Sequence, residues 1–319
     1  MFTDRGAVSG GLLRELRTVA GLGLRSMANR TAFTAGYLSL VENGHKPVSP
    51  AVLDAYRTVL GDPTLGLADV DLERLQATVT DPASAGRSSL DDITTILEAT
   101  RHLEDVAGPE LVTPIVRGID AVARALAAEH VGGALAAGVA SEVARYRGWL
   151  EHATGSPHTA NRALEDAAVL ARDAEDRSQL AHSYSFRAFT ARRQGDLPRA
   201  VALADAAAAV DGTHPIVPVY DLFHRAQLLA MSGEHRAAGK ALVIADRAAE
   251  ATDGIELPSF GYWYTAGFWG VQRAIVLARM GRKAAAVDAA EQGLAAMPAD
   301  HRSTGWATDM LDQVDPDMR

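Results

Sequence analysis

The first part of the chain carries apolar residues at the three- and four-residue spacing of short amphipathic helices. The first stripe consists of Leu12, Leu13, Leu16, Val19 and Ala20. Gly21 follows as a helix stop, and similar stripes predict helices over residues 24–30, 35–43 and 52–60. Thr34 is a suitable N-cap for the third helix, and Gly44 ends it. Four short helices joined by tight turns are typical of the helix-turn-helix geometry.

This segment resembles the Xre/Cro-like family of phage-repressor helix-turn-helix domains. The matching residues are Leu16, Arg17, Ala20, Gly21, Leu22, Leu24, Met27, Ala28, Tyr37, Leu38, Ser39, Glu42, Asn43 and Gly44. The resemblance implies that the segment binds double-stranded DNA. It also implies an internal ion pair between Arg17 and Glu42 that ties the first helix to the third. A folding or dimerising module is the alternative.

The residues expected at the DNA lie on the second and third helices and in the turn after them. They are Arg25, Ser26, Thr34, Ala35, Gly36, Ser39, Leu40, Asn43 and Lys46. In the family, the positions that match Ala35, Gly36 and Leu40 usually carry polar or basic side chains that read bases. Because these three residues have no hydrogen-bonding side chain, we expect a shallow sequence preference, carried by Thr34, Ser39 and DNA shape.

Charge separates the two ends of the chain. Residues 1–61 hold seven Arg and Lys against four Asp and Glu, a net charge of +3, whereas the whole chain carries −9. The remainder therefore carries −12. A basic end on an acidic body presents only that end to phosphates.

The rest of the chain is rich in Ala and Leu and shows no strand-like alternation, which predicts an all-α fold. A turn-rich stretch of small residues over 80–89 indicates a hinge. We therefore predict a helix-turn-helix domain over residues 1–66, a linker over 67–89 and a helical repeat domain over 90–319.

An internal repeat runs through this second domain. Its pattern is Arg, then Gly or Ala, six residues, Gly, four residues and Ala, and it begins at Arg147, Arg187, Arg225 and Arg273. The turn glycines are 40, 38 and 48 residues apart, at Gly155, Gly195, Gly233 and Gly281. The repeat resembles divergent tetratricopeptide repeats, whose period is about 34 residues. The resemblance implies an α-solenoid of stacked helical hairpins.

Acidic residues lie ten positions after the turn glycine in three repeats, as Glu165, Asp205 and Glu291. Across an antiparallel hairpin they are expected opposite the repeat arginine. We therefore expect an arginine–carboxylate ladder that braces each hairpin. In the alternative, the arginines line the groove and hold a ligand.

Stacked hairpins of this kind have a concave inner face on which a peptide or small molecule can lie. The repeat pattern places large aromatic residues there, with Arg, His and Gln between them. The candidate ligand-binding residues are Arg145, Trp149, His182, Phe189, Arg192, Tyr220, Phe223, Gln227, Trp263 and Phe268. Rings supply contact area and polar groups orient the ligand. For the aromatic run over 260–269, packing between repeats is the alternative.

An Xre-like domain ahead of such repeats resembles the RRNPP-type peptide-sensing regulators of Gram-positive bacteria and their phages. The resemblance implies a quorum-sensing transcriptional regulator. It would be a homodimer whose fit to DNA half-sites responds to a peptide or small-molecule effector. The alternative is an adaptor whose repeats bind another protein and whose helix-turn-helix domain locates it on DNA.

Chemistry-bearing motifs are missing from the sequence. It has no cysteine, and it carries neither the G-x-x-x-x-G-K phosphate motif nor the H-E-x-x-H zinc motif. The ten histidines are scattered. We therefore expect no catalytic residue, metal site or cofactor. With no signal-peptide core and no apolar run long enough to span a bilayer, we expect a cytoplasmic protein.

Overall fold

The computed structural model describes residues 10–61, 70 and 72–317, and these form helices without any strand. The all-α fold class is therefore confirmed for the described part of the chain. The chain divides into two compact units, Met1–His102 and Leu103–Arg319. The division falls within one long helix, α6 (Arg87–Ala107). The predicted domain boundaries at 66 and 90 stay a prediction.

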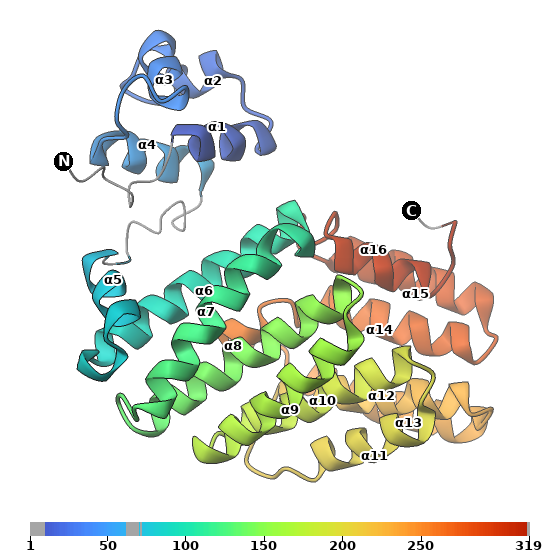
Figure 1. The fold of residues 1–319 in the computed structure, drawn as a ribbon. Coiled ribbons are helices and arrows are strands. Elements are labelled where there is room, and N and C mark those ends of the chain that lie inside the picture. The colour runs from blue at the N-terminus through green and yellow to red at the C-terminus, as the bar shows by residue number, and fades with distance from the viewer. Residues whose placement is uncertain (1–9, 62–69, 71, 318–319) are drawn as a thin grey trace. The chain divides into compact units, whose positions relative to one another are not determined.

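The first unit begins with four short helices, as the hydrophobic pattern predicts (Figure 1). They are α1 (Gly10–Val19), α2 (Leu24–Asn29), α3 (Ala35–Glu42) and α4 (Pro50–Leu60). Their inward faces form one core from Leu13, Met27, Leu38, Val41, Val52 and Tyr56. Side-chain caps set two of the helix starts, because Thr34 accepts a hydrogen bond from the Tyr37 amide and Ser49 from the Val52 amide. The four predicted helices are confirmed to within a few residues.

Two further helical segments precede α6 in this unit, namely α5 (Leu72–Thr80) and the 3₁₀ turn η2 (Pro82–Ser84). A two-point ion pair joins Arg74 of α5 to Asp92 of α6, with both N–O distances at 2.7 Å. Thr78 donates a hydrogen bond to Ser89 over 2.8 Å. Part of the stretch predicted as linker is thus helical and bonded to the start of α6.

The second unit contains α7 (Pro109–Ala128) and then four antiparallel helical hairpins that stack in chain order (Figure 1). The hairpins are α8 (Ala134–Ala153) with α9 (Pro157–Asp173), α10 (Arg177–Arg193) with α11 (Leu197–Ala208), α12 (Val217–Met231) with α13 (His235–Ala251), and α14 (Ala266–Arg279) with α15 (Lys283–Ala296). The 3₁₀ turn η3 (Ser259–Gly261) lies in the connection before α14, and α16 (Gly305–Asp312) follows the last hairpin. This is the predicted tetratricopeptide-like solenoid. None of the described helices is both long and apolar enough to cross a membrane.

The repeat pattern has a direct steric meaning. Its four turn glycines all have positive φ, between 76° and 82°, a conformation that residues with a Cβ rarely adopt. The small residue after the repeat arginine lies against the second helix of the same hairpin. A Cβ on Gly148 would come within 2.5 Å of Leu164 Cγ on α9. The pattern therefore marks the turn of each hairpin and, at Gly148, a close contact between the two helices of the first hairpin.

The predicted ladder within each hairpin is wrong, because the repeat arginines pair with carboxylates of the preceding hairpin. Arg187 pairs with Glu165 over 3.1 Å and Arg225 with Asp205 over 3.3 Å. Arg273 pairs with Asp246 of α13, so the expected pairing with Glu291 is wrong. Since the next residue in each repeat faces the hairpin's own second helix, one helical step of about 100° turns the arginine toward the preceding hairpin. The ion pairs therefore join hairpins to one another.

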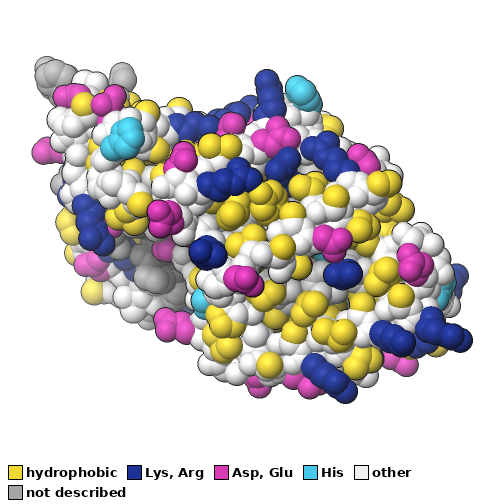
Figure 2. Space-filling model, turned by 90° about the horizontal axis from the view of Figure 1, so that it is seen from below, with side chains coloured by type: hydrophobic (Ala, Val, Ile, Leu, Met, Phe, Trp, Pro, Cys, Tyr) yellow, Lys and Arg dark blue, Asp and Glu magenta, His cyan; other side chains and the backbone are white. Residues whose placement is uncertain are grey.

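Exposed apolar side chains occur on the second helices of the hairpins, at Val169, Val201, Val243 and Ile244. Figure 2 shows one face of the molecule, on which hydrophobic side chains lie between arginines and acids. Such mixing is ordinary for a protein surface.

Candidate functional site

The nine residues predicted at the DNA lie at the surface of the helix-turn-helix unit. Six of them are exposed, namely Arg25, Thr34, Gly36, Leu40, Asn43 and Lys46. The other three, Ser26, Ala35 and Ser39, are half-buried. Leu40 is an apolar side chain left 42% exposed on α3. The exposed side chains of α3 leave this face available to a groove.

Basic side chains flank α3 at both ends of this face. Lys46 places its Nζ 5.0 Å from the centroid of the Tyr37 ring. Arg14 of α1 reaches Asn43 Oδ1 with its Nη1 over 3.4 Å. Sequence reasoning did not select Arg14, although it lies one helical turn before Arg17 and therefore on the same side of α1. Asn43 itself caps α3, since its Nδ2 donates to the Ser39 carbonyl over 2.8 Å.

The ion pair between Arg17 and Glu42 is present beneath this face. Arg17 donates through Nε and Nη2 to the two carboxylate oxygens of Glu42, each over 2.7 Å. Tyr56 of α4 donates its hydroxyl to Glu42 over 2.5 Å, and Arg17 Nη1 donates to the Leu22 carbonyl over 2.6 Å. Burial pushes the pKa of Glu42 up, but the hydrogen bonds from Arg17 and Tyr56 outweigh it and lower that pKa below 4.5. The same burial and the Glu42 contact raise the pKa of Tyr56.

This network ties α1, α3 and α4 to one buried carboxylate. The family resemblance implied the Arg17–Glu42 pair, which is confirmed. The hydrogen bond from Tyr56 was not predicted from the sequence. The network of Arg17, Glu42 and Tyr56 fixes the orientation of α3 relative to α1 and α4.

In the second unit, the ten candidate ligand residues differ in accessibility. Trp149, Phe189, Tyr220 and Trp263 are half-buried, while Arg145, His182, Arg192, Phe223, Gln227 and Phe268 are less than 9% exposed. Phe223 stacks on Trp269 with ring centroids 5.7 Å apart, and both belong to the hydrophobic core with Phe268. The half-buried residues are those that a ligand can reach directly. Ligand binding by any of the ten stays a prediction.

One part of the inner face is covered by the chain itself. The connection between α13 and α14 places Phe260 against His182, with ring centroids 5.3 Å apart, and near the Arg145 guanidinium at 5.7 Å. Tyr264 and His182 share a hydrogen bond of 2.5 Å. Tyr262 donates to Asp105 at the end of α6 over 2.6 Å. The aromatic run over 260–264 therefore packs across first helices of the stack, which supports the packing alternative for Tyr264 and leaves Trp263 half-buried on this connection.

The other part of the inner face lies toward the C-terminal ends of α8, α10 and α12. Phe189 is at its centre, with ring centroids 5.8 Å from Trp149 and 5.3 Å from His152. The Arg192 guanidinium lies 5.1 Å from the Phe189 centroid, and its Nε donates to His224 Nε2 over 3.1 Å. We call Trp149, His152, Phe189, Arg192, His224 and Gln227 the open end of the inner face, since their ring contacts and hydrogen bonds described above are made with one another.

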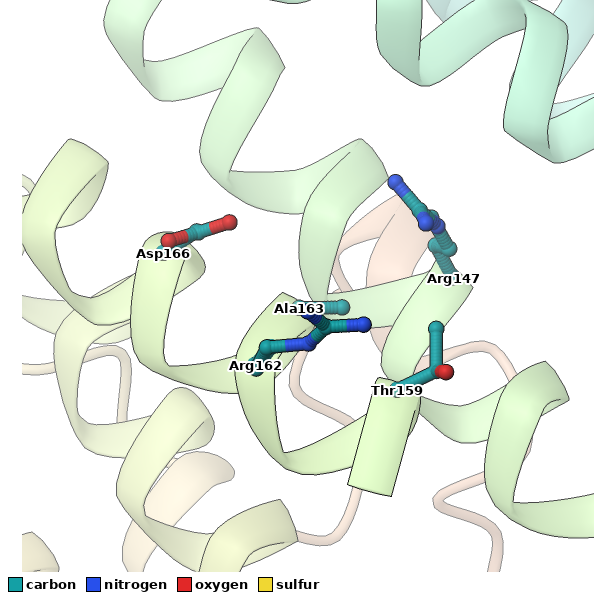
Figure 3. A pocket seen from close by; sticks show the side chains of 5 residues that line it. All are labelled: Arg147, Thr159, Arg162, Ala163 and Asp166. Atoms are coloured by element: carbon teal, nitrogen blue, oxygen red, sulfur yellow. The ribbon is translucent and has the colours of Figure 1, made fainter. Parts of the chain in front are cut away.

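A shallow pocket of about 300 Å³ lies on α8 and α9, lined by Arg147, Thr159, Arg162, Ala163 and Asp166 (Figure 3). Two of its three charged side chains already have partners. Arg147 donates to Asp120 over 2.6 Å, and Asp166 accepts from Arg124 over 3.0 Å. Arg147 and Asp166 of this pocket therefore take part in ion pairs that join α8 and α9 to α7. The open end of the inner face is the better candidate for a ligand site. Within the described residues, no group of three or more His, Asp and Glu could hold a metal ion.

Comparison with known proteins connects these observations to a family for one end of the chain. The search of curated proteins finds no match. Among solved structures, the chain is similar to the crystal structure of Bacillus thuringiensis PlcR in complex with the peptide PapR7 and DNA, with 12% identity and a TM-score of 0.36 over 95% of each chain. Residues 10–64 match the family described as "Helix-turn-helix domain". The four-helix unit with the buried Arg17–Glu42 pair is therefore a helix-turn-helix domain by both its sequence and its geometry.

Proposed function

We propose that the protein is a DNA-binding transcriptional regulator whose helical-repeat domain dimerises and senses a peptide or small ligand. The observation that carries the first half is the outward face of α3, with Thr34, Gly36 and Leu40 exposed and with Lys46 beside it. In helix-turn-helix domains this is the helix that enters the major groove. On this proposal the protein acts in the cytoplasm as a homodimer.

The exposed residues of α3, Gly36 and Leu40, have no polar side chain, and this sets the kind of recognition. Ser39 and Thr34 are the hydroxyl-bearing residues on this face, and Leu40 can contact thymine methyl groups. Arg14, Arg25 and Lys46 can bind phosphates, which position a protein without reading sequence. On this proposal, contacts to phosphates supply most of the affinity for DNA, and the preference for particular bases is weak.

The second half of the proposal rests on the open end of the inner face. Half-buried aromatic rings next to polar groups are typical of ligand sites in helical repeats. The acidic charge of residues 62–319 makes that part unsuited to phosphates, so that the two activities belong to separate units.

The test measures binding of the full chain to a random-sequence duplex DNA pool at two salt concentrations, with Gly36→Glu/Leu40→Glu as the double variant. Two carboxylates on the groove-facing side should abolish retention of DNA. Matched control substitutions at exposed positions of α13, Val243→Glu and Ile244→Glu, should leave it unchanged. If the α3 double variant retained as much DNA as the α13 double variant, the proposed DNA face would be wrong. Co-purification of a short peptide would favour a sensor over an adaptor, and a stoichiometric protein partner would favour the adaptor.

A further inference from the structure

The open end of the inner face holds a buried cation without a counter-charge. Arg192 is 7% exposed, and its hydrogen-bond partner is His224, a neutral ring. Among the described residues it forms no ion pair with a carboxylate, unlike the repeat arginines Arg187 and Arg225. Since a buried charge is costly unless it is paired, Arg192 calls for an anion that the chain does not supply.

The hydrogen bond between Arg192 and His224 determines which nitrogen of the His224 ring carries the hydrogen. Arg192 Nε can only donate, so His224 Nε2 must be the acceptor and Nδ1 must carry the hydrogen. Burial, and after it the charge of Arg192, lower the pKa of His224 to about 3, which keeps the ring neutral. His224 Nδ1 is buried and has no partner within the described residues. It is therefore an unused N–H donor.

A second unused donor lies on the same helix. Gln227 is 3% exposed, and its Nε2 likewise has no hydrogen-bond partner in the described part of the chain. Positions three apart on a helix share one face, so Gln227 and His224 point to the same side of α12. The two NH2 groups of the Arg192 guanidinium add four further N–H donors, because the bond to His224 uses only Nε.

The local charge is positive as well. Burial lowers the pKa of Arg192 most strongly, Tyr220 offsets part of this, and the like charges of Arg193 and Arg279 lower the pKa further. Both of these neighbours are exposed arginines at the C-terminal ends of their helices. The site thus combines several unused donors with the positive charge of Arg192.

We propose that Arg192, His224 and Gln227 bind a carboxylate of the ligand on the inner face. This inference rests on the proposed ligand-sensing function and names the chemical class of that ligand. A carboxylate accepts about four hydrogen bonds on two oxygens and matches the planar fork of arginine. Phe189 covers one face of the guanidinium, and the half-buried rings of Trp149 and Phe189 are placed to contact the apolar body of the ligand. The carboxylate comes either from the C-terminus of a peptide or from a small organic acid.

The test uses the full-length protein and three pools of compounds, analysed by affinity selection and mass spectrometry. The first pool is a heptapeptide library that lacks Asp and Glu and ends in a free carboxylate. The second is the same library with C-terminal amides, and the third holds small aromatic carboxylic acids with their primary amides. We expect acids to be enriched over amides from the first or the third pool, which also identifies the source of the carboxylate. Arg192→Met should reduce that enrichment about 10- to 100-fold, and the neighbouring Arg193→Met should retain most of it.

The melting temperature of the unliganded variants gives a second test that does not depend on ligand binding. Removing a buried charge that has no counter-charge should leave the melting temperature of unliganded Arg192→Met equal to or above that of Arg193→Met. A clear loss of stability in Arg192→Met would show that Arg192 is satisfied within the fold and would overturn the proposal. Equal enrichment of acids and amides would overturn the carboxylate subsite but leave a ligand site. Failure of the wild-type protein to enrich any pool would overturn both.

Discussion

Arg17 and Glu42 form a two-point ion pair at the centre of the helix-turn-helix domain, although 25 residues separate them in the chain. Both are less than 9% exposed, and Tyr56 completes the set of donors to the carboxylate. Because the pair joins α1 to α3, the helix that presents the proposed DNA face is held by a buried charge interaction.

Removing either partner should therefore destabilise this domain. We expect Arg17→Ala or Glu42→Ala to cost about 3 to 5 kcal/mol, since each leaves one buried charge unpaired. Hydrogen exchange of the α1–α4 amides in the full-length protein measures this cost locally. Asp54→Ala removes the exposed partner of a 3.4 Å pair with Arg57 and should cost less than about 1 kcal/mol. Unchanged exchange in both charge variants would mean that the pair does not stabilise the domain.

Lys46 should contribute to DNA affinity through phosphate. Neutralising one phosphate contact changes the slope of log K against log salt by about 0.9, so Lys46→Ala should flatten the slope by roughly that amount and weaken binding to all sequences alike. Anisotropy titrations of full-length protein over a series of salt concentrations give the slope. Lys240→Ala, an exposed lysine of α13, is the matched control. A sequence-dependent loss at Lys46 would instead point to base readout.

Asp221 should make stability fall as the pH rises. It is 3% exposed and neither carboxylate oxygen has a hydrogen-bond partner among the described residues. Burial raises its pKa to about 7. The folded state therefore holds a proton that the unfolded chain, with an ordinary value of 3.8, has released, and stability is lost between about pH 4 and pH 7.

Asp221→Asn should remove this loss. Each pKa unit corresponds to about 1.4 kcal/mol, so the variant should gain a few kcal/mol over wild type at pH 8 and much less at pH 4. Urea unfolding at the two pH values measures the difference, with the exposed Asp205→Asn as a control whose difference should not change. A variant that is equally destabilised at both values would indicate a structural role for the charged carboxylate.

The last hairpin should be intolerant of a side chain at Gly293. A Cβ there would lie 2.8 Å from Val271 N and 2.9 Å from Gly270 C, both backbone atoms of α14. We expect Gly293→Ala to destabilise the second unit by about 1 to 3 kcal/mol, because the two helices must separate. Gly239→Ala, where the nearest atom is a flexible Met280 methyl group at 3.5 Å, should be neutral or stabilising in urea unfolding. Equal effects at both positions would argue against close packing of α14 on α15.

Local features of the chain were determined by sequence alone. Helix periodicity, the cap at Thr34 and the turn glycines of the repeat depend on neighbouring residues, and all of them are present in the structure. The Arg17–Glu42 pair could also be predicted from the sequence, because the resemblance to helix-turn-helix domains implied it. Which residues bind DNA or a ligand stays a prediction, since side-chain type does not say what a surface contacts.

Only the tertiary structure decided how distant segments meet. Arg187 pairs with Glu165 because its side chain is turned toward the preceding hairpin, an orientation that spacing within one hairpin does not reveal. His182 meets Tyr264, 82 residues later, because an irregular connection crosses the first helices of the stack. Periodicity sets which side of a helix is buried, but the partner on the other side depends on the packing of whole hairpins, and that packing left Arg192 buried without an acid.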